Sequence, residues 1–211
     1  MTAPSSDPRA RAAAALRRMG HALSAHDADP QLLERVAVAA DRVTAELEST
    51  PPRTRDLLEL KRRMFDVEVP DGEPVVHFDE CFVSGPWNPL GIGIEVHREG
   101  DEAVAAVRLG AAFEGAPGRS HGGIVAAIFD DVLGYLLTLE NTPGFTGELT
   151  VRYHAPTPIH QPLEFRARLE HREGRKLRTT AEARVADGPD AAVVASAEAV
   201  FIAVDPASFR A

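Results

Sequence analysis

Cysteine is nearly absent from this chain: its 211 residues include one, Cys81. An internal disulfide and an all-cysteine metal site are therefore excluded. The eight histidines show no paired spacing typical of metal ligands, so we expect neither a metal nor another cofactor. Uncharged apolar runs of the roughly 18 residues that a membrane span needs are missing, as is the apolar core of a signal peptide. We therefore expect a cytoplasmic protein that does not bind membranes.

An excess of positive charge is also missing, because the formal net charge is −9 at pH 7. Non-specific binding to nucleic acid depends on cationic side chains and is not expected. Hydrophobic residues, in contrast, make up 44% of the chain. This is enough apolar material for one sizeable core with an appendage.

The first third of the chain has a helical pattern. An alanine- and arginine-rich stretch runs from Arg9 to His21, and a second helix is expected from Pro30 to Ser49, with Asp29 as its N-cap. A third, short helix is expected from Thr54 to Phe65. The second helix has an apolar seam formed by Leu33, Val36, Ala40, Val43 and Leu47. We expect residues 1–70 to form a helical extension that packs on the main domain or on a partner.

The remaining residues, 71–211, predict strands on both sides of one long apolar helix that ends near Leu139. Alternation of apolar and charged residues is clearest from Leu163 to Glu170. Strands, one buried helix and further strands predict an α+β domain in which an antiparallel sheet curls around the helix. The expected strands are Phe78–Val83, Gly91–His97, Ala103–Ala111, Phe145–Tyr153, Leu163–Glu170, Lys176–Val185 and Ala191–Val204.

Two adjacent carboxylates, Asp130 and Asp131, interrupt the apolar helix. A buried acid must be paired, neutralised or put to use. On a helical wheel, at about 100° per residue, Asp130 lies on a face of small residues and Asp131 lies to one side. We therefore expect Asp130 to be the enclosed acid. The other residues of the small face are Gly123, Ala126, Ala127 and Gly134.

The helix starts with His121-Gly122-Gly123. Backbone N–H groups at a helix start lack partners within the helix, so two of them could hold the oxyanion of a carbonyl under attack. A carboxylate about two turns further along could activate water. The alternative is structural: the glycines form a tight entry turn and His121 is a local cap.

Three segments taken together resemble the hotdog-fold acyl-CoA thioesterases, in particular the PaaI-like branch of the thioesterase superfamily. They are the run from Cys81 to Gly91, the His121-Gly122-Gly123 helix and the run from Leu149 to Pro158. The resemblance covers roughly residues 78–204. It implies a hotdog fold, hydrolysis of an acyl-CoA or acyl-carrier thioester, and a homodimer with the site at its interface, or a homotetramer of two such dimers.

The resemblance also implies roles for single residues. The acid nine positions after the motif histidine is Asp130, which acts in the family as general base or as nucleophile. The N–H groups of Gly122 and Gly123 polarise the carbonyl, and His121 organises this turn or contacts the thioester oxygen. A hydroxyl on the next strand orients water from the other subunit. Thr146 matches that position, with Thr150 as second choice.

Basic residues are the candidates for binding the CoA moiety. Gly174-Arg175-Lys176 resembles a phosphate-contacting segment, although these cations are equally typical of an ordinary turn. Glu114 departs from the family, where many relatives have asparagine or glutamine; it could repel CoA, share a proton with Asp130 or lie outside the pocket. The full set of expected substrate contacts is Asn88, Arg152, His154, Arg175 and Lys176.

Two other functions stay open at this point. A hotdog hydratase or dehydratase would also act on a thioester, but the spacing from the histidine to the acid favours hydrolysis. A non-catalytic acyl-CoA sensor would use the helical first third to bind DNA, which its near balance of acids and bases does not favour. No motif encodes the length of the acyl chain.

Overall fold

The computed structural model describes residues 6–54, 68–75, 78–186 and 192–205. Its helices are α1 (Pro8–Ala25), α2 (Pro30–Glu48) and α4 (Gly122–Leu139), with a short 3-10 helix η1 (Ala111–Phe113). Its strands are β1 (Glu95–Glu99), β2 (Glu102–Arg108), β3 (Glu114–Ala116), β4 (Arg119–Ser120), β5 (Gly144–Tyr153), β6 (Pro162–Glu173), β7 (Lys176–Val185) and β8 (Val193–Ala203). Apart from Thr54, the third helix expected from the sequence lies outside the described residues.

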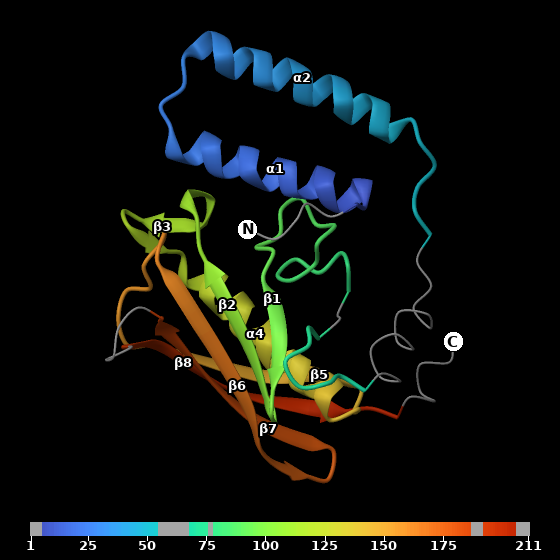
Figure 1. The fold of residues 1–211 in the computed structure, drawn as a ribbon, viewed down its shortest axis with the longest axis vertical. Helices are drawn as coiled ribbons and strands as arrows, with labels where there is room; N and C mark the ends of the chain where they lie inside the picture. Colours follow the sequence, from blue (N-terminus) through green and yellow to red (C-terminus); the bar gives the residue numbers. More distant parts are fainter. Residues whose placement is uncertain (1–5, 55–67, 76–77, 187–191, 206–211) are drawn as a thin grey trace.

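Six strands form one antiparallel sheet in the order β1-β2-β6-β7-β8-β5. The sheet curves around α4, which packs against all six strands (Figure 1). The expected α+β hotdog architecture is therefore confirmed. β5 pairs with β8 on one side and forms one edge of the sheet, while β1 forms the other edge.

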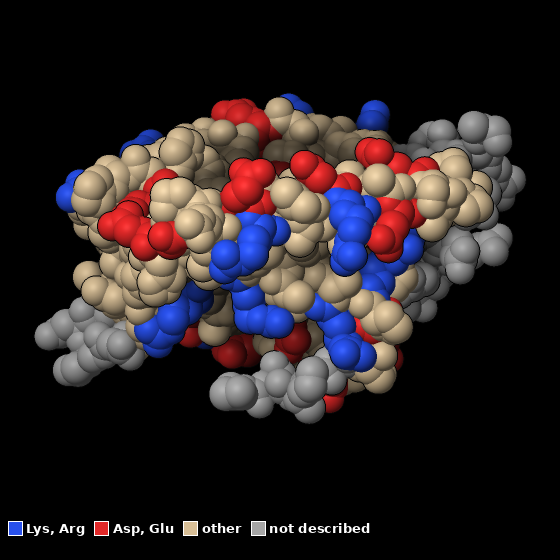
Figure 2. All heavy atoms as spheres, turned by 90° about the horizontal axis from the view of Figure 1, so that it is seen from above, with Lys and Arg blue, Asp and Glu red and all other residues tan. Residues whose placement is uncertain are grey.

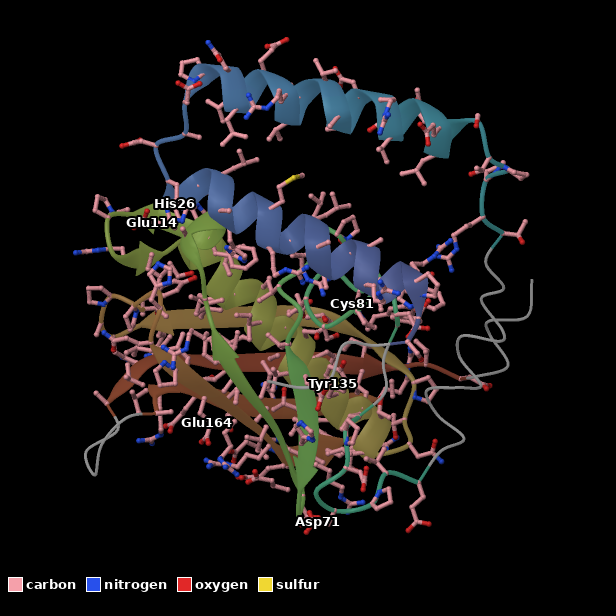
Figure 3. The ribbon with its side chains drawn as sticks, turned by 45° about the horizontal axis from the view of Figure 1, so that its top comes forward. His26, Asp71, Cys81, Glu114, Tyr135 and Glu164 are labelled. Carbon is pink, nitrogen blue, oxygen red and sulfur yellow. The ribbon has the colours of Figure 1, made fainter. Side chains whose placement is uncertain are left out.

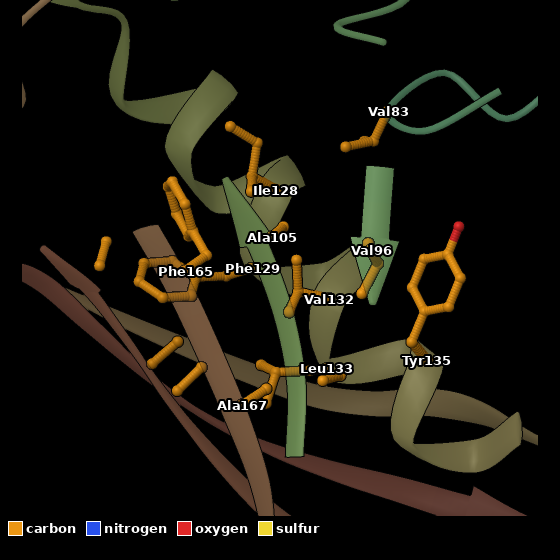
Figure 4. Packing of buried hydrophobic residues seen from close by; sticks show 14 of the residues in the cluster. Val83, Val96, Ala105, Ile128, Phe129, Val132, Leu133, Tyr135, Phe165 and Ala167 are labelled. Carbon is orange, nitrogen blue, oxygen red and sulfur yellow. The ribbon is translucent and has the colours of Figure 1, made fainter. Parts of the chain in front are cut away.

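The bulky side of α4 builds the core. Phe129 of α4 meets Phe165 of β6 edge to face, with ring centroids 5.1 Å apart (Figure 4). Burying a side chain of this size stabilises the fold by roughly 1.5–3 kcal/mol. By length and composition α4 could cross a membrane, but half of it is buried inside the protein, as is typical of a core helix. The buried apolar residues of α4 are Val125, Ile128, Phe129, Val132, Leu133, Tyr135, Leu136 and Leu137.

The expected strand at Phe78–Val83 is wrong. These residues form turns that end in a tight loop, in which the Gly85 N–H donates to the Cys81 carbonyl at 3.0 Å. A Cβ atom at Gly85 would lie 2.3 Å from the Cys81 nitrogen, so only glycine fits there. The first strand of the sheet therefore starts later, at Glu95.

α2 begins as the sequence predicts, and α1 begins in the same way. Asp7 and Asp29 cap α1 and α2, and a proline follows each cap. α1 packs on the hotdog domain: Arg17 Nη1 donates to the Asn88 carbonyl at 2.6 Å, and the Trp87 indole N–H donates to the Asp7 carboxylate. No residue of α2 is buried. In Figure 1, α2 lies on the far side of α1 from the sheet.

Candidate active site

The start of α4 is organised by the motif histidine. His121 is the N-cap, and its Nδ1 accepts a hydrogen bond from the Gly123 N–H at 2.9 Å. The His121 N–H donates in turn to the Phe113 carbonyl at 2.8 Å. Because Gly123 is engaged by its own cap, Gly122 is the better placed oxyanion donor: no described residue accepts from its N–H.

A pocket of about 340 Å³ opens beside Gly122. The Tyr153 hydroxyl donates to the Gly122 carbonyl at 2.7 Å and ties the end of β5 to the start of α4. His154, one of the expected substrate contacts, lines the same pocket. The other lining residues are Arg119, Ser120, Val125, Ala155, Pro156 and Thr157.

Eight residues further along α4, Asp130 meets Thr146. The Thr146 hydroxyl donates to Asp130 Oδ1 at 2.9 Å. A regular strand would put residues 146 and 149 on opposite faces, but β5 has an irregularity between Thr146 and Glu148. Thr146 therefore faces α4 together with Leu149, which packs against the core. The structure joins the two residues within one chain, whereas the expected water-orienting hydroxyl came from the other subunit.

The expectation that Asp130 is the enclosed acid and Asp131 the flank is wrong for the single chain. Asp130 is exposed, whereas Asp131 is buried and accepts a hydrogen bond from the Cys81 thiol at 3.0 Å. The reason is the loop that carries Cys81, which covers α4 on the Asp131 side. Figure 3 shows Cys81 and Tyr135 along this covered part of the molecule.

The same covered side holds a second polar pair. The Tyr135 hydroxyl donates to the Ser84 hydroxyl at 2.9 Å. Burial, helped by the nearby Asp131 carboxylate, raises the pKa of Tyr135 far above its ordinary value. Its hydroxyl therefore stays protonated and anchors the loop to α4. These contacts give Asp131 a structural surrounding that Asp130 lacks.

The remaining expected contacts are spread over three places. Arg175 and Lys176 lie at the β6–β7 turn, where the Arg175 guanidinium donates to the Ala203 carbonyl at 2.9 Å. Ala203 is paired with Gly144, which is two residues before Thr146, so this turn lies at the Thr146 end of β5. Arg152 is exposed on β5. Asn88 lies under α1, and its side chain bonds within its own loop, to Glu80 and Leu90.

Glu114 does not line the pocket. Its carboxylate accepts from the Gly118 N–H at 2.5 Å and closes the small β3–β4 hairpin. In Figure 3 it lies beside His26, at the end of α1. Thr150 lies further along β5 and makes no described hydrogen bond to Asp130.

Sequence reasoning missed Arg119, Tyr153 and Thr157, which line the pocket. Arg119 stands three residues before α4, and this closeness to the motif was the one signal for it. Nothing in the pattern of β5 marks Tyr153 as different from other strand aromatics. Among the described residues, no three His, Cys, Asp or Glu side chains gather as metal ligands would.

Comparisons with known proteins give the family that this chain resembles. Residues 118–192 match the family model described as thioesterase superfamily. A crystal structure of a thioesterase superfamily protein shares 29% identity, covers 96% of this chain and 94% of its own, and superimposes with a TM-score of 0.78.

Curated relatives include the acyl-coenzyme A thioesterases THEM4 of Bos taurus and Xenopus laevis. The first is 27% identical over 60% of this chain, and the second is 30% identical over 55%. The chain spans about half the length of each, 52% and 53%. The matched segment contains α4, β5, β6 and β7, so the part of the chain that builds the candidate site is the part that is similar to the thioesterase superfamily.

Proposed function

We propose that this protein is a thioesterase of the PaaI-like group that hydrolyses acyl-CoA thioesters in the cytoplasm. The observation that carries the proposal is the Thr146–Asp130 hydrogen bond, which joins β5 to the helix that starts with His121-Gly122-Gly123. An exposed carboxylate beside a hydroxyl can hold water and take its proton. A helix start with an available N–H can hold the oxyanion.

The reaction requires no group beyond these residues and water. Asp130 takes a proton from water while the hydroxide oxygen attacks the thioester carbonyl carbon. The oxyanion is held by N–H groups at a helix start, with Gly122 as first donor. When the carbon–sulfur bond breaks, the thiol leaves with the proton that Asp130 took up. The products are a carboxylic acid and CoA.

Within one chain, the oxyanion donor Gly122 and the base Asp130 are too far apart to act on the same carbonyl. Gly122 and Asp130 are eight residues apart on α4, which is about 12 Å along the helix axis. An oxyanion donor and a base that act on the same carbonyl must lie within a few ångströms of each other. The site is therefore complete when Asp130 of one protomer meets Gly122 of a second copy.

The position of β5 at the edge of the sheet, among the strands that the structure describes, supports this pairing. An exposed edge strand offers unpaired backbone groups to another strand, and most of β5 is exposed. Antiparallel pairing of β5 with its symmetry mate places the Thr146 end of one strand beside the Tyr153 end of the other. Tyr153 contacts Gly122, so a two-fold dimer brings Asp130 of each protomer close to the pocket beside Gly122 of the other protomer. The dimer therefore has two equivalent sites.

The same arrangement indicates where the CoA part of the substrate binds. Arg175 and Lys176 lie at the Thr146 end of the sheet, and Arg119 and His154 lie at the pocket. In the dimer these side chains surround one composite site. We propose that they hold the phosphates of CoA, because guanidinium and ammonium groups bind phosphate well.

A thiol-release assay on a panel of acyl-CoAs tests the proposal. We expect hydrolysis by the wild type and a loss of at least about 100-fold in kcat for Asp130→Asn, the size expected for a general base. Asp131→Asn is the neighbouring control and should keep most of the activity of the protein that remains folded. Hydrolysis that survives Asp130→Asn and is lost with Asp131→Asn contradicts the assignment of the base.

Two further outcomes separate the alternatives. Binding of acyl-CoA without hydrolysis of any thioester would favour a sensor, and addition of water to an enoyl-CoA would favour a hydratase. For a sensor, DNA binding by the helical layer would have to be shown. Figure 2, which looks down on that layer, shows acidic and basic side chains intermixed. Such a surface is unlike the continuous basic patch that binds nucleic acid.

A further inference from the structure

The apolar seam of α2 has no use in the proposed reaction. Its residues repeat at intervals of three and four, which is the a/d pattern of helices that pack side by side. Leu33, Val43 and Leu47 are 43%, 45% and 64% exposed. The seam consists of Leu33, Val36, Ala40, Val43 and Leu47.

A helix with this pattern needs a partner. In proteins most of the stability of a helix comes from packing of its apolar face, and α2 buries no residue of its own. α1 packs on η1, and none of the described elements packs on α2 to a comparable extent. α1 also carries exposed apolar side chains, because Leu16, Met19 and Leu23 are exposed at intervals of three and four.

The seam is complementary to itself. A two-fold axis at Ala40 sets Leu33 of one copy opposite Leu47 of another, and it brings Val36 of one copy to within one residue of Val43 of the other along the helix axis. The small side chain at the centre lets the two helices approach closely, and Ala37 and Ala39 beside it are equally small. Such a self-matching surface is what an isologous contact between identical chains requires.

Charge does not oppose this contact. Of the positions directly beside the seam, Leu32, Ala37, Ala39, Thr44 and Glu46, one carries a charge. Glu46 is paired within its own helix with Arg42, at 3.9 Å. The other charged residues of α2 lie further round the helix. No like charges therefore face each other across the axis.

We infer that α2 docks on α2 of a second copy of this chain, antiparallel and with Ala40 at the two-fold axis. The contact shares no residue with the β5 edge, so it joins chains independently of the pairing that completes the active site. The inference does not rest on the proposed function.

Disulfide formation between full-length chains tests the contact. Ala40→Cys places a thiol at the axis, and Ala45→Cys places the same thiol on the opposite side of α2. We expect mild oxidation to link Ala40→Cys chains into dimers several-fold more than Ala45→Cys chains. Equal linkage of the two variants overturns the inference, whatever else covers the seam. Both variants keep Cys81, so its contribution is common to them.

A second substitution in the Ala40→Cys chain provides the matched control. Val43→Glu puts a charge into the seam and should abolish the linkage. Val38→Glu makes the same change on the opposite side of α2, where Val38 is 59% exposed, and should leave the linkage unchanged. Circular dichroism checks that the helices are retained. If linkage persists in the chain with Val43→Glu, or is lost equally with Val43→Glu and with Val38→Glu, the inferred antiparallel contact between the two seams is contradicted.

Discussion

The Thr146 hydroxyl donates a 2.9 Å hydrogen bond to Oδ1 of Asp130 and so links β5 to the helix that the sheet surrounds. This bond orients the carboxylate and leaves its second oxygen available for the water of the proposed reaction. It also holds Asp130 where α4 is not covered by the loop that buries Asp131. The pair is the part of the proposed mechanism that a single substitution can separate from the fold.

Thr146→Val removes the hydroxyl and keeps the shape of the side chain. A hydrogen bond to a charged group is worth about 1.5–3 kcal/mol, so kcat should fall by roughly 10- to 100-fold with little change in KM. Steady-state kinetics on the best acyl-CoA measures the change. Thr150→Val is the control on the same strand, and an equal loss in both variants would reject Thr146 as the residue that orients water.

Gly122→Ala tests the oxyanion site. A Cβ atom at Gly122 would lie 3.2 Å from the Tyr153 hydroxyl, inside the pocket, so the added methyl group should hinder the approach of a carbonyl. We expect kcat/KM to fall by about 10-fold or more, as for the loss of an oxyanion donor. Gly20→Ala is the matched control in α1, where no atom lies within 4 Å of the new Cβ. It should keep full activity and stabilise the protein by up to about 1 kcal/mol.

The docking of α1 should depend on pH through His21. Its Nδ1 accepts from the Ala112 N–H at 3.1 Å, and burial together with nearby His160 lowers the pKa of His21 below its ordinary 6.5. Below that pH the unfolded chain takes up a proton that the folded chain resists, so the contribution to stability is lost as the pH falls.

The free energy of unfolding, measured from pH 7.5 down to pH 5.5, checks this. The wild type should lose more stability over this range than His21→Gln, in which the titrating group is gone. His26→Gln, at the exposed end of α1, should follow the wild type. A wild-type slope equal to that of His21→Gln would show that His21 does not control the docking.

Arg166 is the centre of an ion network that joins three strands. Its guanidinium bonds Glu102 at 2.7 Å, Glu99 at 2.9 Å and Glu164 at 3.3 Å. Arg166→Gln leaves three carboxylates close together, so we expect a loss of about 1–2 kcal/mol that shrinks in 1 M salt.

Urea unfolding at low and high salt measures the effect. Arg168→Gln is the control, because Arg168 is 63% exposed and bonds one carboxylate, Glu170, at 3.0 Å. It should change stability by less than about 0.5 kcal/mol. An equal loss in the two variants, or a loss that salt does not reduce, would mean that the network is not what stabilises this part of the sheet.

Local patterns predicted the repetitive elements well. The apolar periodicity of α4, the Asp29-Pro30 start of α2, and the alternation in β6 each follow from residues a few positions apart. β7 matches its expected bounds, Lys176–Val185. Phe78–Val83 failed because a tight turn at Gly85 overrides the strand propensity of its apolar residues.

Local patterns did not predict which acid of the pair Asp130 and Asp131 is buried. A helical wheel gives the side on which an acid lies, but it does not tell which side another segment covers. Cys81 is 50 positions from Asp131, so the cover comes from the tertiary fold. The irregularity in β5 is a similar case, because one extra residue decides whether Thr146 faces Asp130 or solvent.

α1 is connected to the start of α4 through the His21 side chain and the backbone of η1. The Nδ1 atom of His21 accepts a hydrogen bond from the Ala112 N–H. The carbonyl of the following residue, Phe113, accepts a hydrogen bond from the His121 N–H. A catalytic fragment cut at residue 70 would therefore keep every proposed reacting group and lose the support beneath the helix start that binds the oxyanion. α1 therefore supports the candidate site from outside the hotdog domain, and shortened versions designed for crystallisation or engineering should retain it.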